Sequence, residues 1–182
     1  MVQRLGRVER REQILDAATR AFARSGYAGT GLDDVAAEAG ITRVLLYRHF
    51  DSKKDLYLAV LGRAMLRLSE TMGPGTYDEH TIPSLLRAAS ADPNGFRLVF
   101  RHAAREPEFG ELVDSMTTRS REVAFSYMTE IADPQWREWV AALLPVVTLE
   151  AVIAWLDAGE PPGGAERVNA AVQGVIRAAL GS

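Results

Sequence analysis

The sequence predicts an all-α protein of about nine helices, and two observations support this fold class. Apolar residues recur at spacings of three and four along almost the whole chain, which is the period of one helical face. No run of strand length alternates between apolar and polar residues with turn signals at its ends. A chain of 182 residues can bury a core without disulfides, and this one has no cysteine.

Glycines and capping residues delimit the first four predicted helices. These are expected around 14–22, over 32–39, from 42 to about 50, and from 52 to about 71. The first helix should stop at Ser25-Gly26, because glycine tolerates the left-handed conformation that ends many helices. Gly40 should end the second helix, and Thr42 is placed to cap the third.

Prolines and glycines divide the rest of the chain. Asp92-Pro93 and Asp133-Pro134 each combine a capping residue with a proline at the first helical position, so each should open a helix. Gly73-Pro74-Gly75 and residues 159–164 are predicted loops. The later helices are expected around 82–89, from 92, over 109–127, from 133, and around 168–180.

Residues 31–50 have the form of a helix-turn-helix. In this arrangement the second helix enters the DNA major groove. Small Ala36 and Ala39 would let the two helices approach closely, and Gly40 permits the sharp turn. The residues expected to face inward are Val35, Ala36, Ala39, Ile41, either Leu45 or Leu46, and Phe50.

The predicted second helix has a surface suited to DNA. No acidic residue occurs from 41 to 50, and the polar residues there donate hydrogen bonds: Thr42, Arg43, Tyr47, Arg48 and His49. Arg43 lies near the helix start and could grip a guanine. Lys53 opens the following helix, where free N–H groups suit a phosphate. The pattern alone leaves a solvated helical hairpin as the alternative.

The net charge of −3 argues against a nucleic-acid partner only if it is spread evenly. Residues 1–54 carry ten Lys/Arg and seven Asp/Glu, whereas residues 55–182 carry eleven Lys/Arg and seventeen Asp/Glu. We therefore expect a basic DNA-binding domain over 1–54 and an acidic second domain over 55–182.

Residues 11–60 resemble the N-terminal domain of the TetR (tetracycline-repressor) family of transcriptional regulators. The motifs that carry the resemblance are I-L-D-A-A-x-x-x-F at 14–22, S-G-Y at 25–27, D-V-A-x-x-A-G at 34–40 and L-Y-x-H-F-x-S-K-x-x-L at 46–56. Beyond Val60 the likeness is to general architecture only. The resemblance implies a C-terminal domain for ligand binding and homodimerisation.

The resemblance and the surface chemistry together give a set of candidate DNA-binding residues. These are Thr30, Thr42, Arg43, Val44, Tyr47, Arg48, His49, Lys53, Arg4 and Arg7. Thr30 would contact a phosphate near the start of the second helix. Val44 departs from the glycine that is frequent in the family and would offer methyl groups to a thymine. Arg4 and Arg7 belong either to an arm in the minor groove or to a disordered basic tail.

The C-terminal candidates are apolar residues at helical spacing, for which plain core packing is the alternative. The expected ligand pocket comprises Phe96, Phe100, Phe109, Met116, Tyr127 and Met128. The expected dimer interface comprises Trp139, Leu143, Val147, Trp155, Val172 and Ile176. The apolar stretch from Trp139 to Leu156 contains Glu150 and lacks basic anchors, so we expect a buried helix or an interface, not a membrane span.

These observations predict a cytoplasmic, ligand-responsive DNA-binding regulator. We expect a homodimeric repressor that leaves a palindromic operator when a small hydrophobic effector binds. The alternative is an α-helical protein-interaction module without DNA binding. An enzyme is not expected, because no metal-ligand spacing, phosphate-binding glycine loop or nucleophile elbow is found, and no cofactor or metal is predicted. The start MVQRLGRVERR lacks the apolar core of a secretion signal.

Overall fold

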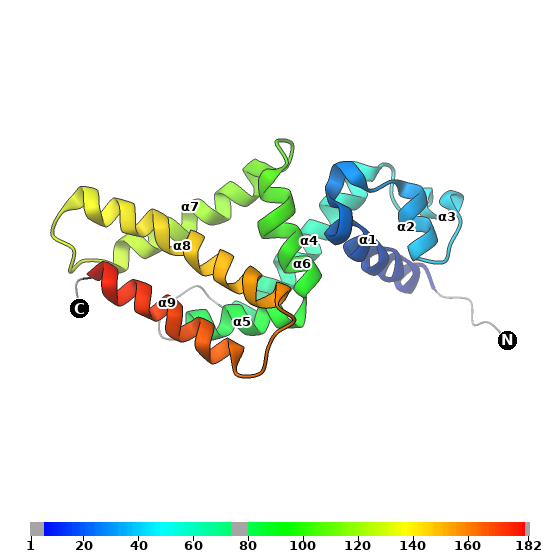
Figure 1. Cartoon of the computed structure of the whole chain (residues 1–182). Coiled ribbons are helices and arrows are strands. Elements are labelled where there is room, and N and C mark those ends of the chain that lie inside the picture. Colours follow the sequence, from blue (N-terminus) through cyan, green and yellow to red (C-terminus); the bar gives the residue numbers. More distant parts are fainter. Residues whose placement is uncertain (1–5, 74–79, 181–182) are drawn as a thin grey trace.

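The computed structural model describes residues 6–73 and 80–180, and every regular element within these ranges is helical. The all-α prediction is therefore confirmed. Figure 1 shows α1, α2 and α3 gathered at one end of the molecule and α5, α7, α8 and α9 at the other, with α4 and α6 between them. Pro74 and Gly75 of the predicted loop lie outside the described residues.

The N-terminal helices are α1 (Arg7–Gly29), α2 (Leu32–Glu38) and α3 (Arg43–Tyr47). The α1 helix is interrupted at Gly26, whose φ of +69° confirms the break predicted there. The Thr42 hydroxyl accepts a hydrogen bond from the Leu45 N–H and caps α3 as predicted. The helix ends at Tyr47, earlier than expected, because the Arg48 and His49 N–H groups bond three residues back and tighten the last turn.

The α4 helix (Lys53–Met72) connects the two ends of the molecule, and Ser52 caps it through the Asp55 N–H. It is followed by α5 (Thr81–Ala91) and α6 (Pro93–Arg97), the latter capped by Asp92. The chain then winds through a π-helical turn η1 (Leu98–His102) and a 3₁₀ turn η2 (Ala103–Arg105). This irregular stretch was not predicted from the sequence.

Three long helices complete the bundle: α7 (Gly110–Tyr127), α8 (Pro134–Asp157) and α9 (Gly164–Leu180). Asp133 caps α8 as predicted by accepting from the Gln135 and Trp136 N–H groups. By length and composition α8 could cross a membrane, although 39% of its apolar window is buried inside the protein. Val140 and Ile153 on its inner side are almost fully buried against the bundle, which fits a core helix.

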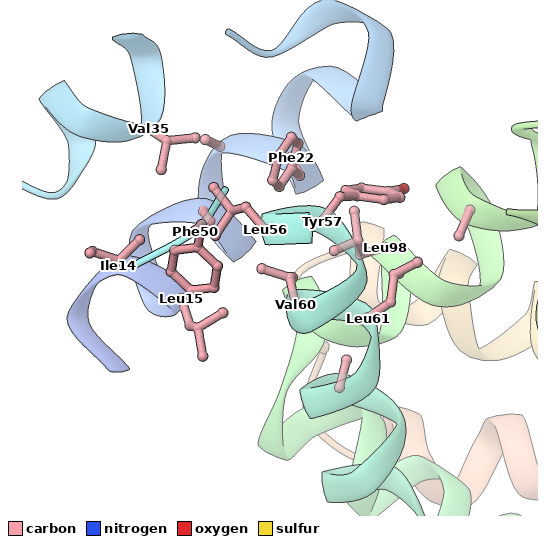
Figure 2. Close-up of a cluster of buried hydrophobic side chains, with 14 of the residues drawn as sticks. Ile14, Leu15, Phe22, Val35, Phe50, Leu56, Tyr57, Val60, Leu61 and Leu98 are labelled. Carbon is pink, nitrogen blue, oxygen red and sulfur yellow. The ribbon is translucent and has the colours of Figure 1, made fainter. Parts of the chain in front are cut away.

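The largest buried cluster joins the N-terminal helices to the bundle. Figure 2 shows Phe22 from α1, with Leu56, Tyr57 and Val60 from α4 and Leu98 from η1, in one group. Phe109 at the start of α7 belongs to the same cluster. Buried apolar contacts thus cross the expected division between residues 54 and 55, and α4 packs against both α1 and the bundle.

Candidate nucleic-acid interface and ligand cavity

The packing of α2 against α3 fixes which side of α3 faces solvent. Val35, Leu46 and Phe50 are almost completely buried. Of the two candidates Leu45 and Leu46, the structure buries Leu46 and leaves Leu45 partly exposed. Gly40 has a φ of +63°, which is the left-handed conformation that the turn needs.

Side chains of α1 support the helix-turn-helix from behind. Gln13 donates a hydrogen bond from Nε2 to the Ala39 carbonyl at 2.9 Å. Arg11 donates from Nη1 to the His49 carbonyl at 3.0 Å, and its guanidinium lies 4.2 Å from the centre of the Phe50 ring. The turn and the end of α3 are therefore both tied to α1, which holds the outer face of α3 in a fixed orientation.

The outer face of α3 and its two flanking residues carry five of the ten predicted DNA-binding residues. Thr42, Arg43, Val44, Tyr47 and Arg48 are all exposed. A shallow hollow of about 700 Å³ separates α3 from the start of α1, and its lining comprises Gly6, Arg7, Arg10, Thr42, Val44, Leu45, Arg48 and His49. Arg7 and Arg48 therefore line the same hollow. The sequence reasoning missed Arg10, whose helical spacing from Arg7 could have indicated it.

Arg43 is already engaged in the absence of DNA. Its Nη1 donates to Asp33 Oδ2 at 2.8 Å, and its Nη2 donates to the Tyr47 hydroxyl at 3.3 Å. The hydrogen bond to Tyr47 and the charge of Asp33 both raise the pKa of Arg43. These two hydrogen bonds orient the guanidinium on the surface.

The two lysines at the start of α4 have different partners. The ammonium of Lys53 lies 4.5 Å from the centre of the Tyr27 ring and has no ion pair among the described residues. Lys54 forms an ion pair with Glu108 at 2.6 Å, which links α4 to the segment before α7. Lys53 is thus available for a phosphate, whereas Lys54 connects the N-terminal end of the protein to the bundle.

Among the remaining candidates Thr30, His49 and Arg4, Thr30 is the one that the structure contradicts. Thr30 is only 3% exposed, and its hydroxyl donates to the Gly26 carbonyl at 2.8 Å, so a phosphate contact by this side chain is wrong. The hydroxyl instead satisfies the backbone at the break in α1. His49 is half-buried, and burial together with Arg7, Arg11 and Arg10 lowers its pKa. Arg4 lies outside the described residues.

A large cavity opens inside the bundle, with a volume of about 1390 Å³. Its walls come from α4, α5, η1, α7, α8 and α9. Four of the six predicted pocket residues line it: Phe100, Met116, Tyr127 and Met128. All the methionines except Met1 line it, since Met65 and Met72 of α4 join Met116 and Met128.

The other two predicted pocket residues lie elsewhere. Phe109 is 2% exposed and packs edge-on to Tyr27 with ring centres 4.9 Å apart, in the cluster that joins α1, α4 and α7. Phe96 lies against Phe100 and faces a separate small hollow of about 210 Å³. Both predictions are wrong because helical spacing identifies a buried face and not the partner that buries it.

The predicted interface residues are divided between an outer and an inner surface. Trp139 of α8 is 51% exposed and stacks on Trp136. Leu143 and Val147 are half-buried. Val172 is almost fully buried, so an interface role is wrong for it, and Ile176 of the same helix lines the cavity.

Trp155 is also directed inward, beneath the start of α9. Its indole Nε1 is buried and has no hydrogen-bond partner. The outer face of α8 instead carries Trp139, Val146, Glu150 and Ala154, which are all exposed. No group of three or more His, Asp or Glu side chains that could hold a metal ion occurs among residues 6–73 and 80–180.

Comparison with known proteins matches the N-terminal part of the chain to one family. The model of bacterial regulatory proteins of the tetR family matches residues 14–60. The transcriptional activator FasR of Mycolicibacterium smegmatis is 30% identical over 98% of this chain and 84% of its own length. A transcriptional repressor of Streptomyces coelicolor is 37% identical over 48% of this chain and 46% of its own.

The fold has a counterpart among solved structures. A TetR-like transcriptional regulator from Rhodococcus sp. RHA1 superposes with a TM-score of 0.76 at 24% identity, covering 98% of this chain and all of that one. The likeness therefore extends over the C-terminal bundle, where the sequence motifs are absent.

Proposed function

Because the chain belongs to the TetR family of bacterial regulatory proteins, we propose that it is a one-component switch that couples a small apolar ligand to operator DNA. It is a DNA-binding transcriptional regulator. The observation that carries the proposal is the presence in one chain of an acid-free outer face on α3 and a 1390 Å³ cavity in the bundle. The α4 helix reaches from one to the other.

In the DNA-bound state α3 lies in the major groove. Arg43 reads a guanine and Val44 contacts a thymine methyl, since both lie in the first turn of α3. Tyr47, Arg48 and Lys53 bind phosphates, which fixes the position of the protein without selecting a sequence. Arg7 and Arg10 approach the backbone from the start of α1, because they share the hollow with Arg48.

The regulator acts as a homodimer joined through the outer faces of α8 and α9. Trp139 and Val146 are about half exposed on α8, and exposed apolar side chains of this size are typical of an interface. A two-fold axis there would present two α3 helices about 34–36 Å apart, one turn of DNA, on a palindromic operator. The protein carries out this role in the cytoplasm.

Ligand binding controls, through α4, the distance between the two α3 helices of the dimer. Met65, Leu68 and Met72 line the cavity, while Leu56 and Tyr57 of the same helix are buried against α1. A ligand that favours a different position of α4 would change the distance between the N-terminal helices of the two subunits. This change would lower the affinity for DNA. A typical coupling free energy of about 1–3 kcal/mol corresponds to roughly 5–150-fold release.

The regulatory output is repression. The Streptomyces coelicolor relative is named a repressor, whereas FasR is named an activator, so a promoter–reporter assay distinguishes the two outputs. Deletion of the gene raises expression from the target promoter if the protein represses it, and lowers expression if it activates.

Binding to the gene's own upstream DNA tests the proposal. Fluorescence anisotropy is measured for that DNA and for a scrambled duplex over 50–300 mM salt, about the range in which counterion release changes affinity steeply. We expect sequence-selective binding that weakens with salt, and release by lipophilic ligands. Equal affinity for both duplexes would favour the alternative, a helical module whose partner is a protein.

A further inference from the structure

We propose that Arg63 of α4 is a positioning residue that fixes the orientation of the N-terminal helices relative to α4, and thereby the half-site spacing that the dimer accepts in its operator. The inference rests on the proposed function, since it concerns a dimer on a palindromic operator. It starts from a cluster of polar contacts between α1 and α4, in which one guanidinium holds three side chains of α1.

Arg63 reaches from α4 to one face of α1. Its Nη1 donates to Glu12 Oε2 at 3.0 Å and lies 2.8 Å from Asp16 Oδ1, while its Nη2 donates to the Thr19 hydroxyl at 3.0 Å. The three α1 residues are spaced by four and three positions, which places them along one side of the helix. The guanidinium is therefore restrained by contacts that extend over about two turns of α1.

The Arg63 contact is partly shielded from water. The Arg63 side chain is only 12% exposed, although Glu12 and Asp16 are about half exposed. Thr19 is almost fully buried, and its hydroxyl donates to the Leu15 carbonyl at 2.8 Å, so it is oriented to accept from Arg63. Charge-assisted hydrogen bonds from the rigid guanidinium fork are stronger and more specific in geometry than exposed ion pairs. The contact therefore favours one relative position of the two helices.

The apolar cluster between the same helices holds them together in a different way. Figure 2 shows Ile14 and Phe22 of α1 grouped with Leu56 and Val60 of α4. Apolar attraction depends on buried area and has no preferred direction, whereas a hydrogen bond weakens steeply when its angle changes. Arg63 thus adds an angular restraint to a contact made by packing.

One turn of α1 carries both the contact to Arg63 and the contacts to the helix-turn-helix. Glu12 meets Arg63, whereas its neighbours Arg11 and Gln13 donate to backbone carbonyls at the end of α3 and in the turn. A rotation of α1 relative to α4 therefore also moves α3. Met65, two residues after Arg63, lines the cavity, so the Arg63 contact lies close to the part of α4 that a ligand would touch.

Arg67 lies one turn further along α4 and provides a matched comparison. Its Nη1 lies 3.3 Å from Asp92 Oδ2, and its side chain is 47% exposed. Because Asp92 caps α6, this pair joins α4 to the bundle and not to α1. Loss of Arg67 therefore removes the same charge from the same helix without changing the contact between α4 and α1.

The test compares two operators that differ only in half-site spacing. Duplexes that bind the wild-type protein are selected from a random library, and one base pair is then inserted at the centre of the selected palindrome. Fluorescence anisotropy gives the affinity for both duplexes, and their ratio is the spacing penalty. In Arg63→Met this penalty should fall by about 2- to 30-fold, the range over which single residues alter coupling between sites. Arg67→Met should keep the wild-type penalty, and an unchanged penalty in Arg63→Met would overturn the inference.

Variants on the α1 side show whether the polar contact itself is responsible. Glu12→Gln with Asp16→Asn keeps the side-chain sizes and leaves Arg63 in place, and it should lower the spacing penalty as Arg63→Met does. Arg63→Lys keeps the charge but lacks the fork, so its penalty should lie between those of the wild type and Arg63→Met. A penalty that falls in Arg63→Met and in neither of the others would assign the effect to lost packing and refute the positioning role.

The distance between the N-terminal helices can be measured directly, because the chain contains no cysteine. Ala37→Cys places one spin label per subunit on the exposed surface of α2, outside the predicted DNA-binding residues. Double electron–electron resonance on the DNA-free dimer gives the distribution of distances between the two labels. Arg63→Met should broaden this distribution and Arg67→Met should not. A change in folding stability alone does not alter the distribution among folded dimers, so equal widths would contradict the positioning role.

The same measurements separate this inference from the proposed function. If the wild-type protein selects no duplex, the proposed operator binding fails, and the inference fails with it. If it selects duplexes with a single half-site, the dimeric operator is wrong, and Arg63 has no spacing to set. If palindromes are selected and every variant shows the same penalty, operator binding stands and the role of Arg63 is refuted.

Discussion

Arg43 of α3 is hydrogen-bonded to Asp33 of α2, with 2.8 Å between Nη1 and Oδ2. Both side chains are more than half exposed, so the pair contributes little to folding stability. The pair acts instead on the DNA-binding surface, because the carboxylate of Asp33 on α2 holds the arginine that we expect to contact a base. Asp33 thus sets the position of Arg43 before DNA arrives.

Asp33→Asn should reduce specificity while raising affinity for random DNA. The substitution removes a negative charge from the DNA-facing surface and releases Arg43. We expect random-duplex affinity to rise by up to about 5-fold, the upper range for exposed charge interactions. The ratio of operator to random affinity, measured by fluorescence anisotropy, should fall. Asp51→Asn removes an equal charge away from Arg43 and should leave this ratio unchanged; an unchanged ratio in Asp33→Asn would contradict the positioning role.

Arg43→Ala should relax base preference at one operator position. The loss of a bidentate contact to guanine is worth about 1–3 kcal/mol at the preferred base pair and little at a changed one. Binding to a panel of single-base operator variants measures this. Arg48→Ala should instead weaken every variant about equally. A panel that keeps its preference in Arg43→Ala would assign base reading to another residue.

Lys53→Ala and Lys54→Ala form a matched pair of neighbouring substitutions. Lys53 is available for a phosphate, whereas Lys54 is paired with Glu108. The slope of log affinity against log salt should therefore become shallower by about 1 in Lys53→Ala. In Lys54→Ala it should remain that of the wild type. The reverse result would exchange the roles of the two lysines.

Local signals in the sequence predicted much of this structure. Thr42, Asp92 and Asp133 cap the helices that they were expected to open, because capping depends on hydrogen bonds within three residues. The left-handed conformation at Gly26 is equally local. Such features depend on residues that are close together in the chain, so a single sequence is enough to predict them.

The misplaced residues depend on contacts between distant segments. Phe109 was assigned to the cavity, yet it packs against Tyr27 and Tyr57, which lie far away in the sequence. Thr30 was assigned to DNA, yet its hydroxyl binds the carbonyl exposed by the break at Gly26. Periodicity predicts that a residue is buried or exposed, and only the tertiary arrangement supplies its partner.

Leu46→Ala and Leu45→Ala should differ strongly in stability. Leu46 of α3 is completely buried, and its truncation should lower the free energy of unfolding by about 2–5 kcal/mol. Leu45 is partly exposed, so the same change should lower it by less than about 1 kcal/mol. Urea denaturation followed by circular dichroism, at one protein concentration, measures both. Similar losses would mean that α3 is rotated from the orientation described.

Val146→Arg should dissociate the proposed dimer. Val146 is 52% exposed on the outer face of α8, and a charge buried at an interface is strongly unfavourable unless it is paired. Sedimentation equilibrium should show the variant shifted toward monomer. Val8→Arg makes the same change at a 77% exposed valine of α1 and should leave the association unchanged. A dimer that persists in Val146→Arg would place the interface on another face.

The stability of the protein should fall below about pH 7 because two histidines are held in their neutral form. Burial lowers the pKa of His102, and Arg101 and Arg105 lower it further, against the opposing effects of the Ala23 backbone and Glu106. The pKa of His49 is lowered in the same way. The unfolded chain then binds more protons, so the free energy of unfolding decreases as the pH falls through the ordinary histidine value toward the folded-state pKa values.

His102→Gln removes one of these groups and should flatten the pH dependence of the free energy of unfolding between about pH 7 and pH 5, measured by urea denaturation at each pH. His49→Gln with His102→Gln should flatten it further. A steeper dependence in either variant would mean that protonation of these rings stabilises the fold, contrary to their burial.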